Sequence, residues 1–320
     1  MKWYNGRIVI MKALVTGCAG FIGSNLTDQL LKDKFQVIGI DSLTTYYSKE
    51  MKKSNIRNAL RNKNFYFIEK DILKIKNFPE VDFVFHLAAQ AGVRDSWGKN
   101  FHSYVKDNVE VTQRLLEFYK DFKIKKFVYS SSSSVYGDSK LPMNENSILK
   151  PISPYGVTKL DAENLCYLYW KNYNLPIISL RYFSVYGPRQ RPDMVIYKIV
   201  KSIINGNEML IYGNGEQKRD FTYIDDVVNA IIVSANMNFT GEVFNVGGGS
   251  TISINNLVKE IETITGEKAI INYSEKVKGD AKDTWADLSK IKQLLNWYPK
   301  FDIKSGLREY IYWYKYEYKS

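Results

Sequence analysis

Short apolar runs alternate with longer amphipathic stretches along the first 183 residues. The amphipathic stretches, which we predict as helices, cover residues 22–33, 99–121 and 154–173. Strands that alternate with helices form a parallel sheet with helices on both faces, so the pattern predicts an α/β fold with a doubly wound sheet. The apolar runs predicted as strands are residues 13–15, 36–40, 65–68, 81–86, 127–129 and 177–180.

The first predicted strand leads directly into a glycine-rich loop, Thr16-Gly-Cys-Ala-Gly-Phe-Ile-Gly23. Three glycines at this spacing allow a tight turn, close approach to a pyrophosphate, and a helix whose first N–H groups point at that anion. The second apolar run ends in Asp41, 18 residues after Gly23, where an acidic residue binds the ribose hydroxyls of a dinucleotide. A carboxylate there repels a 2′-phosphate, which favours NAD over NADP; the alternative is a plain tight turn. The residues expected to bind NAD here are Gly17, Gly20, Phe21, Ile22, Gly23 and Asp41.

The rhythm of the chain changes after about residue 184, where prolines and glycines break it into shorter elements. We therefore expect a Rossmann-like NAD-binding domain over residues 11–183, with returning segments near 220–248. Residues 184–320 are expected to form mainly a smaller C-terminal α/β lobe for the substrate, and residues 1–10 an N-terminal extension. At 320 residues with 45% hydrophobic content, the chain is long enough for such a core.

Composition limits the partners and the compartment. No apolar run is long enough to span a bilayer, and Cys18 and Cys166 provide neither a disulfide framework nor a metal cluster, so we expect a cytoplasmic protein without metal. The net charge of +11 is spread along the chain rather than gathered in one arm. This distribution favours attraction of a polyanionic small molecule over nucleic-acid binding. The aromatic and basic tail, residues 310–320, is predicted to be a last helix packed on the body rather than a membrane-surface segment.

Oxidation of an alcohol by hydride transfer needs a group that takes the hydroxyl proton near neutral pH. A tyrosine can do this when a cation stabilises its phenolate, and a lysine four residues later on a helix lies on the same face. The chain contains at least six Tyr-x-x-x-Lys pairs, but only Tyr155 and Lys159 follow a proline at an expected helix start. Ser132 lies shortly before, at a strand end, where it is either a substrate ligand or a plain turn serine.

Together these segments resemble the extended short-chain dehydrogenase/reductases and, within them, the nucleotide-sugar 4-epimerases. The resemblance extends over residues 11–317. The motifs that carry it are Thr16-Gly-Cys-Ala-Gly-Phe-Ile-Gly23, His86-Leu-Ala-Ala89, Ser130-Ser-Ser-Ser-Ser-Val-Tyr-Gly137, Pro154-Tyr-Gly-Val-Thr-Lys159, Arg181-Tyr-Phe-Ser-Val-Tyr-Gly-Pro188, Arg219-Asp-Phe-Thr-Tyr-Ile-Asp-Asp226 and Thr284-Trp-Ala-Asp287.

The resemblance implies further cofactor contacts. Asp71 and Ile72 would flank the adenine, and Ala88 and Asn108 would lie along the cofactor. Lys159 would tune the catalytic tyrosine and hold the nicotinamide ribose.

For the substrate, the resemblance implies that Tyr155 is the catalytic base and that Ser132 orients the sugar oxygen. Tyr212 would stack on uracil and Arg219 would bind a phosphate of UDP. A second phosphate-binding arginine is missing near residues 276–279, where Lys276 or Lys278 is the expected substitute.

The implied reaction is epimerisation at C4 through a 4-keto sugar that turns about its diphosphate link before it is reduced again. Related dehydratases carry an acidic pair directly after the Ser or Thr at position 132. Here Ser133 and Ser134 stand in those places, which is evidence against dehydration.

Two features bear on the choice of sugar: the first favours a uronic acid, and the second, a small residue at position 284, would admit larger sugars, including an N-acetylhexosamine. The segment from Ser184 to Met194 resembles UDP-glucuronate 4-epimerases, in which the small hydroxyl residue and the following arginine, here Arg191, contact the sugar carboxylate. Arg94 also recurs in those enzymes, and Thr284 bears on the room around the sugar. The alternative interpretation of Arg191 is a surface arginine that begins a helix.

We therefore predict an NAD-dependent UDP-sugar 4-epimerase, with UDP-glucuronate and UDP-galacturonate as the first choice. UDP-N-acetylglucosamine or UDP-glucose 4-epimerase is the alternative, and UDP-glucuronate decarboxylase ranks below it. The resemblance also implies a homodimer in which the helices at 99–121 and 154–173 pair with those of a second copy.

Overall fold

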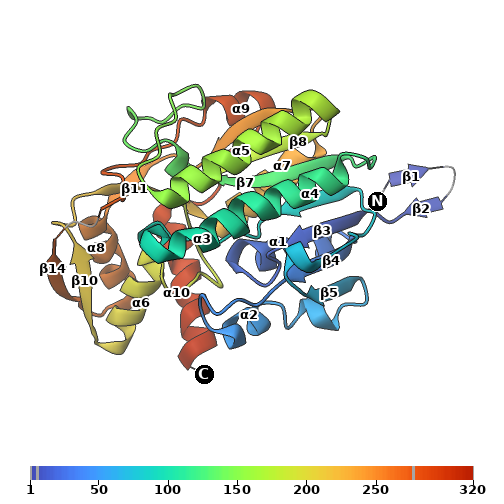
Figure 1. Ribbon diagram of the computed structural model, residues 1–320. Helices are drawn as coiled ribbons and strands as arrows, with labels where there is room; N and C mark the ends of the chain where they lie inside the picture. Colours follow the sequence, from blue (N-terminus) through green and yellow to red (C-terminus); the bar gives the residue numbers. More distant parts are fainter. Residues whose placement is uncertain (1, 5–6, 276–277, 320) are drawn as a thin grey trace.

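The computed structural model of the chain describes residues 2–4, 7–275 and 278–319. Its centre is a sheet of seven strands, all parallel, whose order is third-second-first-fourth-fifth-sixth from one edge, with one further strand beyond the sixth (Figure 1). The predicted Rossmann-like α/β fold is confirmed. In spatial order the strands are β5 (Phe65–Glu69), β4 (Gln36–Asp41), β3 (Lys12–Thr16), β6 (Phe83–His86), β7 (Lys126–Ser132), β8 (Ile177–Tyr182) and β12 (Glu242–Val246).

Helices cover both faces of this sheet. Ala13 and Val15 of β3 belong to one apolar cluster and Leu14 to another, because successive side chains of a strand point to opposite faces. The first cluster lies under helices α1 (Phe21–Lys32) and α7 (Ile224–Asn236). The second lies under α4 (Val111–Tyr119) and α5 (Pro154–Tyr173). Burial on both faces explains why these strands are continuous apolar runs in the sequence.

Helix α5 has the bounds predicted from the sequence. The hydroxyl of Ser153 accepts a hydrogen bond of 3.1 Å from the N–H of Gly156, and Pro154 occupies the first turn. At the other end Asn174 takes the left-handed conformation that ends helices. These local signals determine where Tyr155 and Lys159 lie.

The helix predicted over residues 99–121 is not regular. It consists of α3 (Phe101–Tyr104), a π-helical segment over Val105–Glu110, and α4. A π segment inserts an extra residue into the turn and often occurs at functional sites. Here it contains Asn108, one of the predicted cofactor residues.

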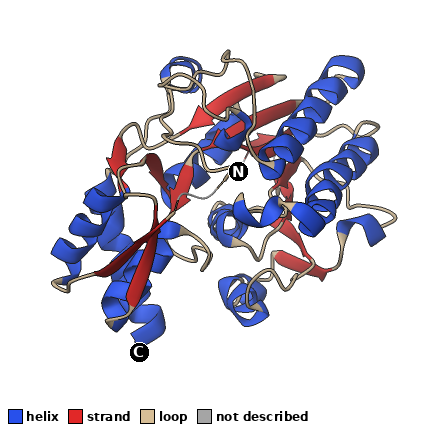
Figure 2. Ribbon diagram, turned by 60° about the vertical axis from the view of Figure 1, so that its left-hand side comes forward, coloured by secondary structure: helices blue, strands red, loops and turns tan. Residues whose placement is uncertain are grey.

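The second half of the chain builds two smaller sheets beside the large one (Figure 2). In one, β10 (Glu208–Tyr212) pairs parallel with β14 (Ile270–Ser274). In the other, β11 (Lys218–Tyr223) lies between β9 (Ser184–Tyr186) and β13 (Thr251–Ser253). The remaining helices are α2 (Lys49–Asn55), α6 (Val195–Asn205), α8 (Ile254–Thr265), α9 (Ser289–Leu295) and α10 (Ile303–Lys319), with 3₁₀ turns at Ala59–Arg61, Ile72–Lys74, Arg94–Ser96, Gly98–Asn100 and Ser133–Val135.

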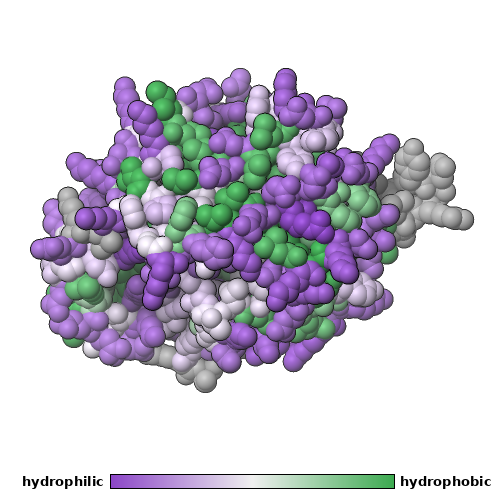
Figure 3. All heavy atoms as spheres, viewed as in Figure 1, coloured by the Kyte–Doolittle hydropathy of each residue, from purple (hydrophilic) through white to green (hydrophobic). Residues whose placement is uncertain are grey.

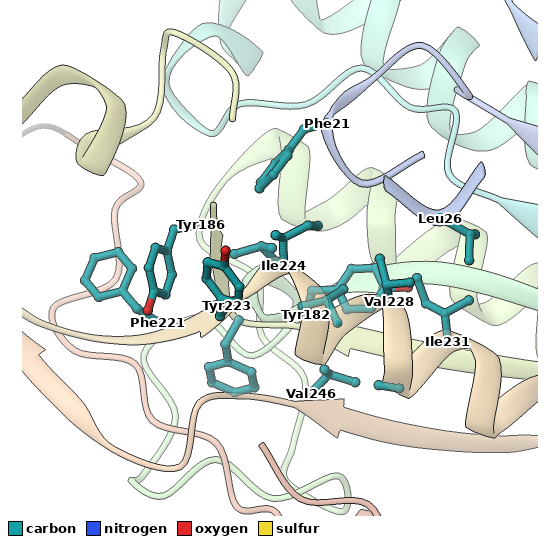
Figure 4. Close-up of a cluster of buried hydrophobic side chains, with 14 of the residues drawn as sticks. Phe21, Leu26, Tyr182, Tyr186, Phe221, Tyr223, Ile224, Val228, Ile231 and Val246 are labelled. Atoms are coloured by element: carbon teal, nitrogen blue, oxygen red, sulfur yellow. The ribbon is translucent and has the colours of Figure 1, made fainter. Parts of the chain in front are cut away.

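One apolar core joins the large sheet to the smaller ones. In Figure 4, Ile224, Val228 and Ile231 of α7 lie near Tyr182 and Val246 of the large sheet. The same cluster continues into β9 and β11, where the rings of Tyr186 and Tyr223 approach to 5.5 Å between centroids. After it has formed β9, β10 and β11 of the smaller sheets, the chain thus returns to the large sheet through α7 and β12.

The two ends of the chain differ in how they contact the rest of the molecule. Strands β1 (Lys2–Tyr4) and β2 (Arg7–Val9) form an antiparallel hairpin that pairs with no other described strand. Helix α10 buries Leu307 and Tyr310 completely, so the predicted packing of the last helix on the body is confirmed. Within the described ranges, no helix combines the length and apolar character needed to cross a membrane.

Candidate active site

The glycine loop forms one end of a long cavity at the carboxyl ends of the strands. Gly17 has φ of +68°, and a Cβ built there would lie 2.8 Å from the backbone nitrogen of Ala88. A Cβ on Gly23 would lie 2.1 Å from the carbonyl oxygen of Gly17. Side chains are thus excluded where the loop folds against α1, and the cavity wall there is bare backbone facing the start of a helix.

Asp41 stands beside the glycine loop at the end of β4. Its Oδ2 accepts from the N–H of Ala19 at 3.0 Å and its Oδ1 from the N–H of Leu43 at 2.8 Å. Each oxygen retains a lone pair toward the cavity that Asp41 lines, which suits two ribose hydroxyls. Burial raises the pKa of this carboxyl, while the two N–H bonds and the ammonium of Lys52 oppose the shift.

Asp71 and Ile72, which we expect to flank the adenine, line the same cavity just after the end of β5. Asp71 accepts from the N–H of Leu73 at 3.0 Å and from the Nζ of Lys106 at 2.7 Å. The pKa of Asp71 is lowered; burial raises it, and the bond from Lys106 is the largest of the opposing effects.

Ala88 lines the cavity, whereas Asn108 stands behind the wall. Asn108 is fully buried; its Oδ1 accepts from the N–H of Gln90 at 2.8 Å, and its Nδ2 donates to the carbonyl of Gln90 at 3.1 Å. Its Nδ2 also donates to the hydroxyl of Thr158 at 2.9 Å. The structure therefore ties Asn108 to the loop after β6 and to α5, so it supports the wall beside which we expect the cofactor.

A buried histidine, to which the sequence analysis assigned no role, stabilises the same wall of the cavity. The Nδ1 of His86 lies 2.8 Å from the hydroxyl of Thr16, and its Nε2 lies 2.9 Å from that of Thr112. The Thr112 hydroxyl donates to the carbonyl of Asn108, so it accepts from a protonated Nε2, and Thr16 then donates to Nδ1. Burial, with the charge of Lys159, lowers the pKa of His86 to about 3, so this ring is neutral.

Tyr155 lines the cavity, and Ser132, the last residue of β7, lies beside it without lining the cavity. The hydroxyl of Ser132 accepts from the N–H of Ser134 at 3.1 Å and is also hydrogen-bonded to the phenol of Tyr155. Burial raises the pKa of Tyr155, and the Ser132 bond and the charge of Arg191 lower it. The two residues therefore present adjoining hydroxyls.

Lys159 also lines the cavity, as does Tyr155. Its Nζ donates to the carbonyl of Ser130 at 2.5 Å and lies 4.5 Å from the ring centre of Tyr129. Burial lowers the pKa of Lys159 to about 8. Arg191 is a second cation near the phenol, and its charge lowers the pKa of Tyr155 against the larger effect of burial.

Arg191 also lines the cavity, so the alternative of a surface arginine is wrong. Its Nε and Nη2 each donate to the carboxylate of Asp193, both at 3.0 Å. The phenol of Tyr46 donates to the same carboxylate at 3.3 Å. Neither Asp193 nor Tyr46 was assigned a role from the sequence.

Three predicted substrate residues form a second cluster, outside the lining of that cavity. The guanidinium of Arg94 lies 4.3 Å from the ring centre of Tyr212 and is paired with Asp280 at 2.9 Å. Arg219 donates to the backbone carbonyls of Ala281 and Lys282 at 2.7 and 2.8 Å. The face of Tyr212 that we expected to receive uracil is thus shared with Arg94.

The remaining predicted residues are placed as follows. Thr284 follows Ala281 and Lys282 in the chain, and its hydroxyl is buried without a hydrogen-bond partner among the described residues. Ser184 opens β9 opposite Phe221 and does not line the cavity. Lys278 is exposed, and Lys276 lies outside the described residues.

The cavity fits a dinucleotide on the protein's own geometry. Its bare backbone cradle requires glycines, the carboxylate of Asp41 lines it at the end of β4, and Tyr155 and Lys159 line it as well. Gly17 and Ala88 meet where the strand order reverses between β3 and β6, the position at which such sheets bind ligands.

Comparison with known proteins gives consistent matches. A family model described as GDP-mannose 4,6 dehydratase matches residues 14–310. A protein of Bacillus subtilis named as an uncharacterized UDP-glucose epimerase, YtcB, is 46% identical over 302 residues, which are 93% of this chain and 96% of that protein. The UDP-glucuronate 4-epimerase of Thermodesulfobacterium geofontis is 42% identical over 310 residues, 94% of this chain and 95% of that protein.

Among solved structures, the UDP-glucuronic acid 4-epimerase from Bacillus cereus in complex with UDP-glucuronic acid and NAD superposes with a TM-score of 0.93. It is 43% identical in sequence, and the match covers 96% of this chain and all of that one.

Proposed function

This chain belongs to the family described as GDP-mannose 4,6 dehydratase, as the resemblance to extended short-chain dehydrogenase/reductases predicted, and we propose that it is an NAD-dependent UDP-sugar 4-epimerase. Its preferred pair of substrates is UDP-glucuronate and UDP-galacturonate. Two named UDP-glucuronate 4-epimerases support the assignment, each more than 40% identical over nearly the whole chain. Dehydration, the activity in the family description, would need an acid pair where this chain has Ser133 and Ser134.

The observation that carries the proposal is one cavity lined at one end by the glycine loop and at the other by Tyr155, Lys159 and Arg191. A sugar attached to a diphosphate can reach both a phenol and a guanidinium there. A guanidinium recognises a carboxylate by charge and by paired N–H donors, which favours a uronic acid over a neutral hexose.

The chain's residues perform the proton half of the reaction. Tyr155, as the phenolate, takes the proton of the C4 hydroxyl while the C4–H bond breaks and the C4–O bond becomes a carbonyl. NAD, when bound, supplies the acceptor of that hydride and returns it. Ser132 donates a hydrogen bond to the same sugar oxygen and holds it beside the phenol. After the 4-keto sugar has turned, Tyr155 returns the proton to the oxygen as C4 is reduced from the other face.

A uronic acid adds a constraint on the site. Its 4-keto form is a β-keto acid, which can lose carbon dioxide. An epimerase must hold the carboxylate so that this path stays slow, whereas a decarboxylase must promote it. UDP-glucose is the alternative substrate that the name of the Bacillus subtilis relative supports.

A product assay across UDP-sugars tests the assignment. The purified protein, given UDP-glucuronate and no added NAD, is expected to form UDP-galacturonate without release of carbon dioxide. Parallel reactions with UDP-glucose and UDP-N-acetylglucosamine measure the preference. Turnover of either neutral sugar with no conversion of UDP-glucuronate contradicts the uronate assignment, and release of carbon dioxide favours a decarboxylase.

A homodimer in the cytoplasm completes the proposal. Val157, Asp161, Asn164 and Leu168 form one exposed face of α5, with the spacing of a single helical stripe. Figure 3 shows apolar side chains among polar ones on the side of the molecule that α4 and α5 occupy. Two unpaired cysteines suit a reducing compartment. The proposal also includes the division into an NAD-binding domain, residues 11–183 with returning segments near 220–248, and a substrate lobe formed mainly by residues 184–320.

A further inference from the structure

The segment between β9 and α6, residues 187–194, is anchored to the NAD-binding side of the molecule. Arg189 pairs with Asp28 of α1 at 2.6 Å, and the side-chain amide of Asn25 donates to the carbonyl of Pro188 at 3.2 Å. The backbone from which Arg191 projects is therefore held by α1, the helix that follows the glycine loop.

The guanidinium of Arg191 uses only one of its edges within the protein. Asp193 accepts from Nε and Nη2 in the paired geometry typical of arginine and carboxylate. No residue in the described ranges accepts a hydrogen bond from Nη1, although Arg191 lines the cavity. The Nε–Nη2 edge is thus taken by Asp193, and the Nη1–Nη2 edge is the one left for a substrate carboxylate.

Asp193 is itself fixed from the cofactor side. Tyr46, which donates to its Oδ2, belongs to the loop after Asp41 and lines the cavity. A Cβ built on Gly92 would lie 2.4 Å from the phenol oxygen of Tyr46, so this loop also touches the loop after β6. The carboxylate of Asp193 is therefore held by two donors from segments far apart in the sequence.

We propose that Asp193 is a positioning and specificity-determining residue, which occupies the Nε–Nη2 edge of Arg191 so that only the Nη1–Nη2 edge receives the substrate carboxylate. This inference rests on the proposed function, because it assumes a carboxylate at C5 of the sugar. One open edge gives the carboxylate a single position that keeps C4 beside Tyr155, whereas without the Asp193 charge the Nε–Nη2 edge would also be open and the sugar could be drawn away from Tyr155.

The same ion pair sets the charge that Tyr155 experiences. Arg191 is the cation that lowers the pKa of Tyr155, and Asp193 offsets part of its charge. The ionisable groups and hydroxyls that face the Tyr155 phenol from the surrounding elements are Ser132, Lys159, Tyr104, Tyr129 and Arg191. A change at Asp193 leaves Ser132, Lys159, Tyr104 and Tyr129 in place and alters only the partner of Arg191, so a shifted pH profile reports the Asp193–Arg191 pair.

The test is Asp193→Asn, which keeps the size and one acceptor but removes the charge. Dissociation constants of UDP-glucuronate and UDP-glucose are measured by calorimetry on the holoenzyme, and kcat against pH is measured with UDP-glucuronate. The variant is expected to bind UDP-glucuronate about threefold more tightly and to turn it over about tenfold more slowly, since small misplacements of a bound substrate cost large factors in rate. UDP-glucose binding is expected to be unchanged, and the acid limb of the profile is expected to move to lower pH.

Asp82→Asn is the control, since Asp82 is also an ion-paired carboxylate, bonded to Lys125 at 2.9 Å with its side chain 27% exposed, but it does not line the cavity. It should leave the affinities and the pH limb as in the wild type. Weaker or unchanged UDP-glucuronate binding in the Asp193 variant, equal losses with both sugars, or an unmoved pH limb overturns this inference alone. A wild-type enzyme that does not convert UDP-glucuronate overturns the proposed function and this inference with it.

Discussion

Burial and neighbouring charge act in opposite directions on the phenol of Tyr155. Burial raises its pKa, and the Ser132 bond and the Arg191 charge lower it. Replacing Tyr155 with Phe removes the proton acceptor and leaves the ring that lines the cavity. We expect kcat to fall by roughly 10²- to 10⁴-fold with NAD affinity retained, measured by product formation and by cofactor titration.

Tyr167→Phe provides the control on the same helix. Tyr167 also precedes a lysine by four residues, but its side chain is 54% exposed and does not line the cavity. Wild-type turnover is expected for this variant. A Tyr155 variant that keeps its rate would refute the assigned base.

His86 makes stability depend on pH. Its pKa is about 3 in the folded chain against 6.5 for an ordinary histidine, because the ring is buried beside Lys159. Between these values the unfolded chain binds the extra proton, so stability is fully present above about pH 6.5 and is lost as the pH falls toward 3. From pH 7 to pH 5 the loss attributable to His86 is about 2 kcal/mol.

Denaturant unfolding at pH 7 and pH 5 measures this contribution. His86→Gln should lose about 2 kcal/mol less than the wild type between the two values. His102, the chain's other histidine, is exposed, and its replacement by Gln should leave the pH dependence unchanged. The same pH dependence in the His86 variant and the wild type would refute a neutral buried ring.

At the scale of single elements, a methyl group added to Gly23, where β3 leads into α1, has two opposing effects. Gly23 lies inside α1, where alanine is favoured over glycine by about 1 kcal/mol. A Cβ there nevertheless lies 2.1 Å from the carbonyl oxygen of Gly17 and must displace the cofactor loop. Gly23→Ala is therefore expected to retain helix content and to weaken NAD binding about tenfold or more, measured by calorimetry on the cofactor-free protein.

Gly206→Ala tests whether any lost glycine has this effect. Gly206 ends α6 at φ +63°, and nothing lies within 4 Å of a Cβ built there. A loss of stability without loss of NAD affinity is expected for it. Equal NAD affinity of the Gly23 variant and the wild type would show that the loop tolerates displacement.

Features of elements that depend on neighbouring residues could be predicted from the sequence. The cap at Ser153 with Pro154 fixed the start of α5, and the spacing from the glycines to Asp41 identified the two ends of one binding site. The π segment over Val105–Glu110 could not be predicted, because its apolar spacing differs little from that of a regular helix.

Contacts between segments that are distant in the sequence could not be predicted either. Tyr46 and Asp193 are 147 residues apart, and no local pattern marks them as partners. Helical spacing placed Lys159 on the same face as Tyr155, but it gave no sign that the carbonyl of Ser130 on β7 accepts a hydrogen bond from this ammonium. Asp193 stood beside Arg191 in the motif and could have been found by asking which carboxylate satisfies a buried arginine.

At the scale of the whole molecule, the cofactor side and the substrate side are linked by a continuous core rather than by a flexible linker. Helix α7 and strand β12 belong to the second half of the sequence but pack on the large sheet. The segment that contains Arg191 is anchored to α1 through the pair of Arg189 with Asp28, so the residue proposed to select the substrate moves with the residues proposed to hold NAD. We therefore expect the sugar and the NAD to keep a constant position relative to each other when bound.

The proposed homodimer has a direct test on α5. Leu168 is 49% exposed on the stripe that begins at Val157, and a glutamate there would place a charge in an apolar contact between two copies. Leu60, 52% exposed on a 3₁₀ turn of the NAD-binding side, is a control of the same residue type and similar exposure. By light scattering, the wild type and Leu60→Glu are expected at about twice the 37.1 kDa mass of one chain, and Leu168→Glu at about that mass itself. A dimer that survives Leu168→Glu places the interface elsewhere, and a wild-type monomer refutes the pairing of these helices.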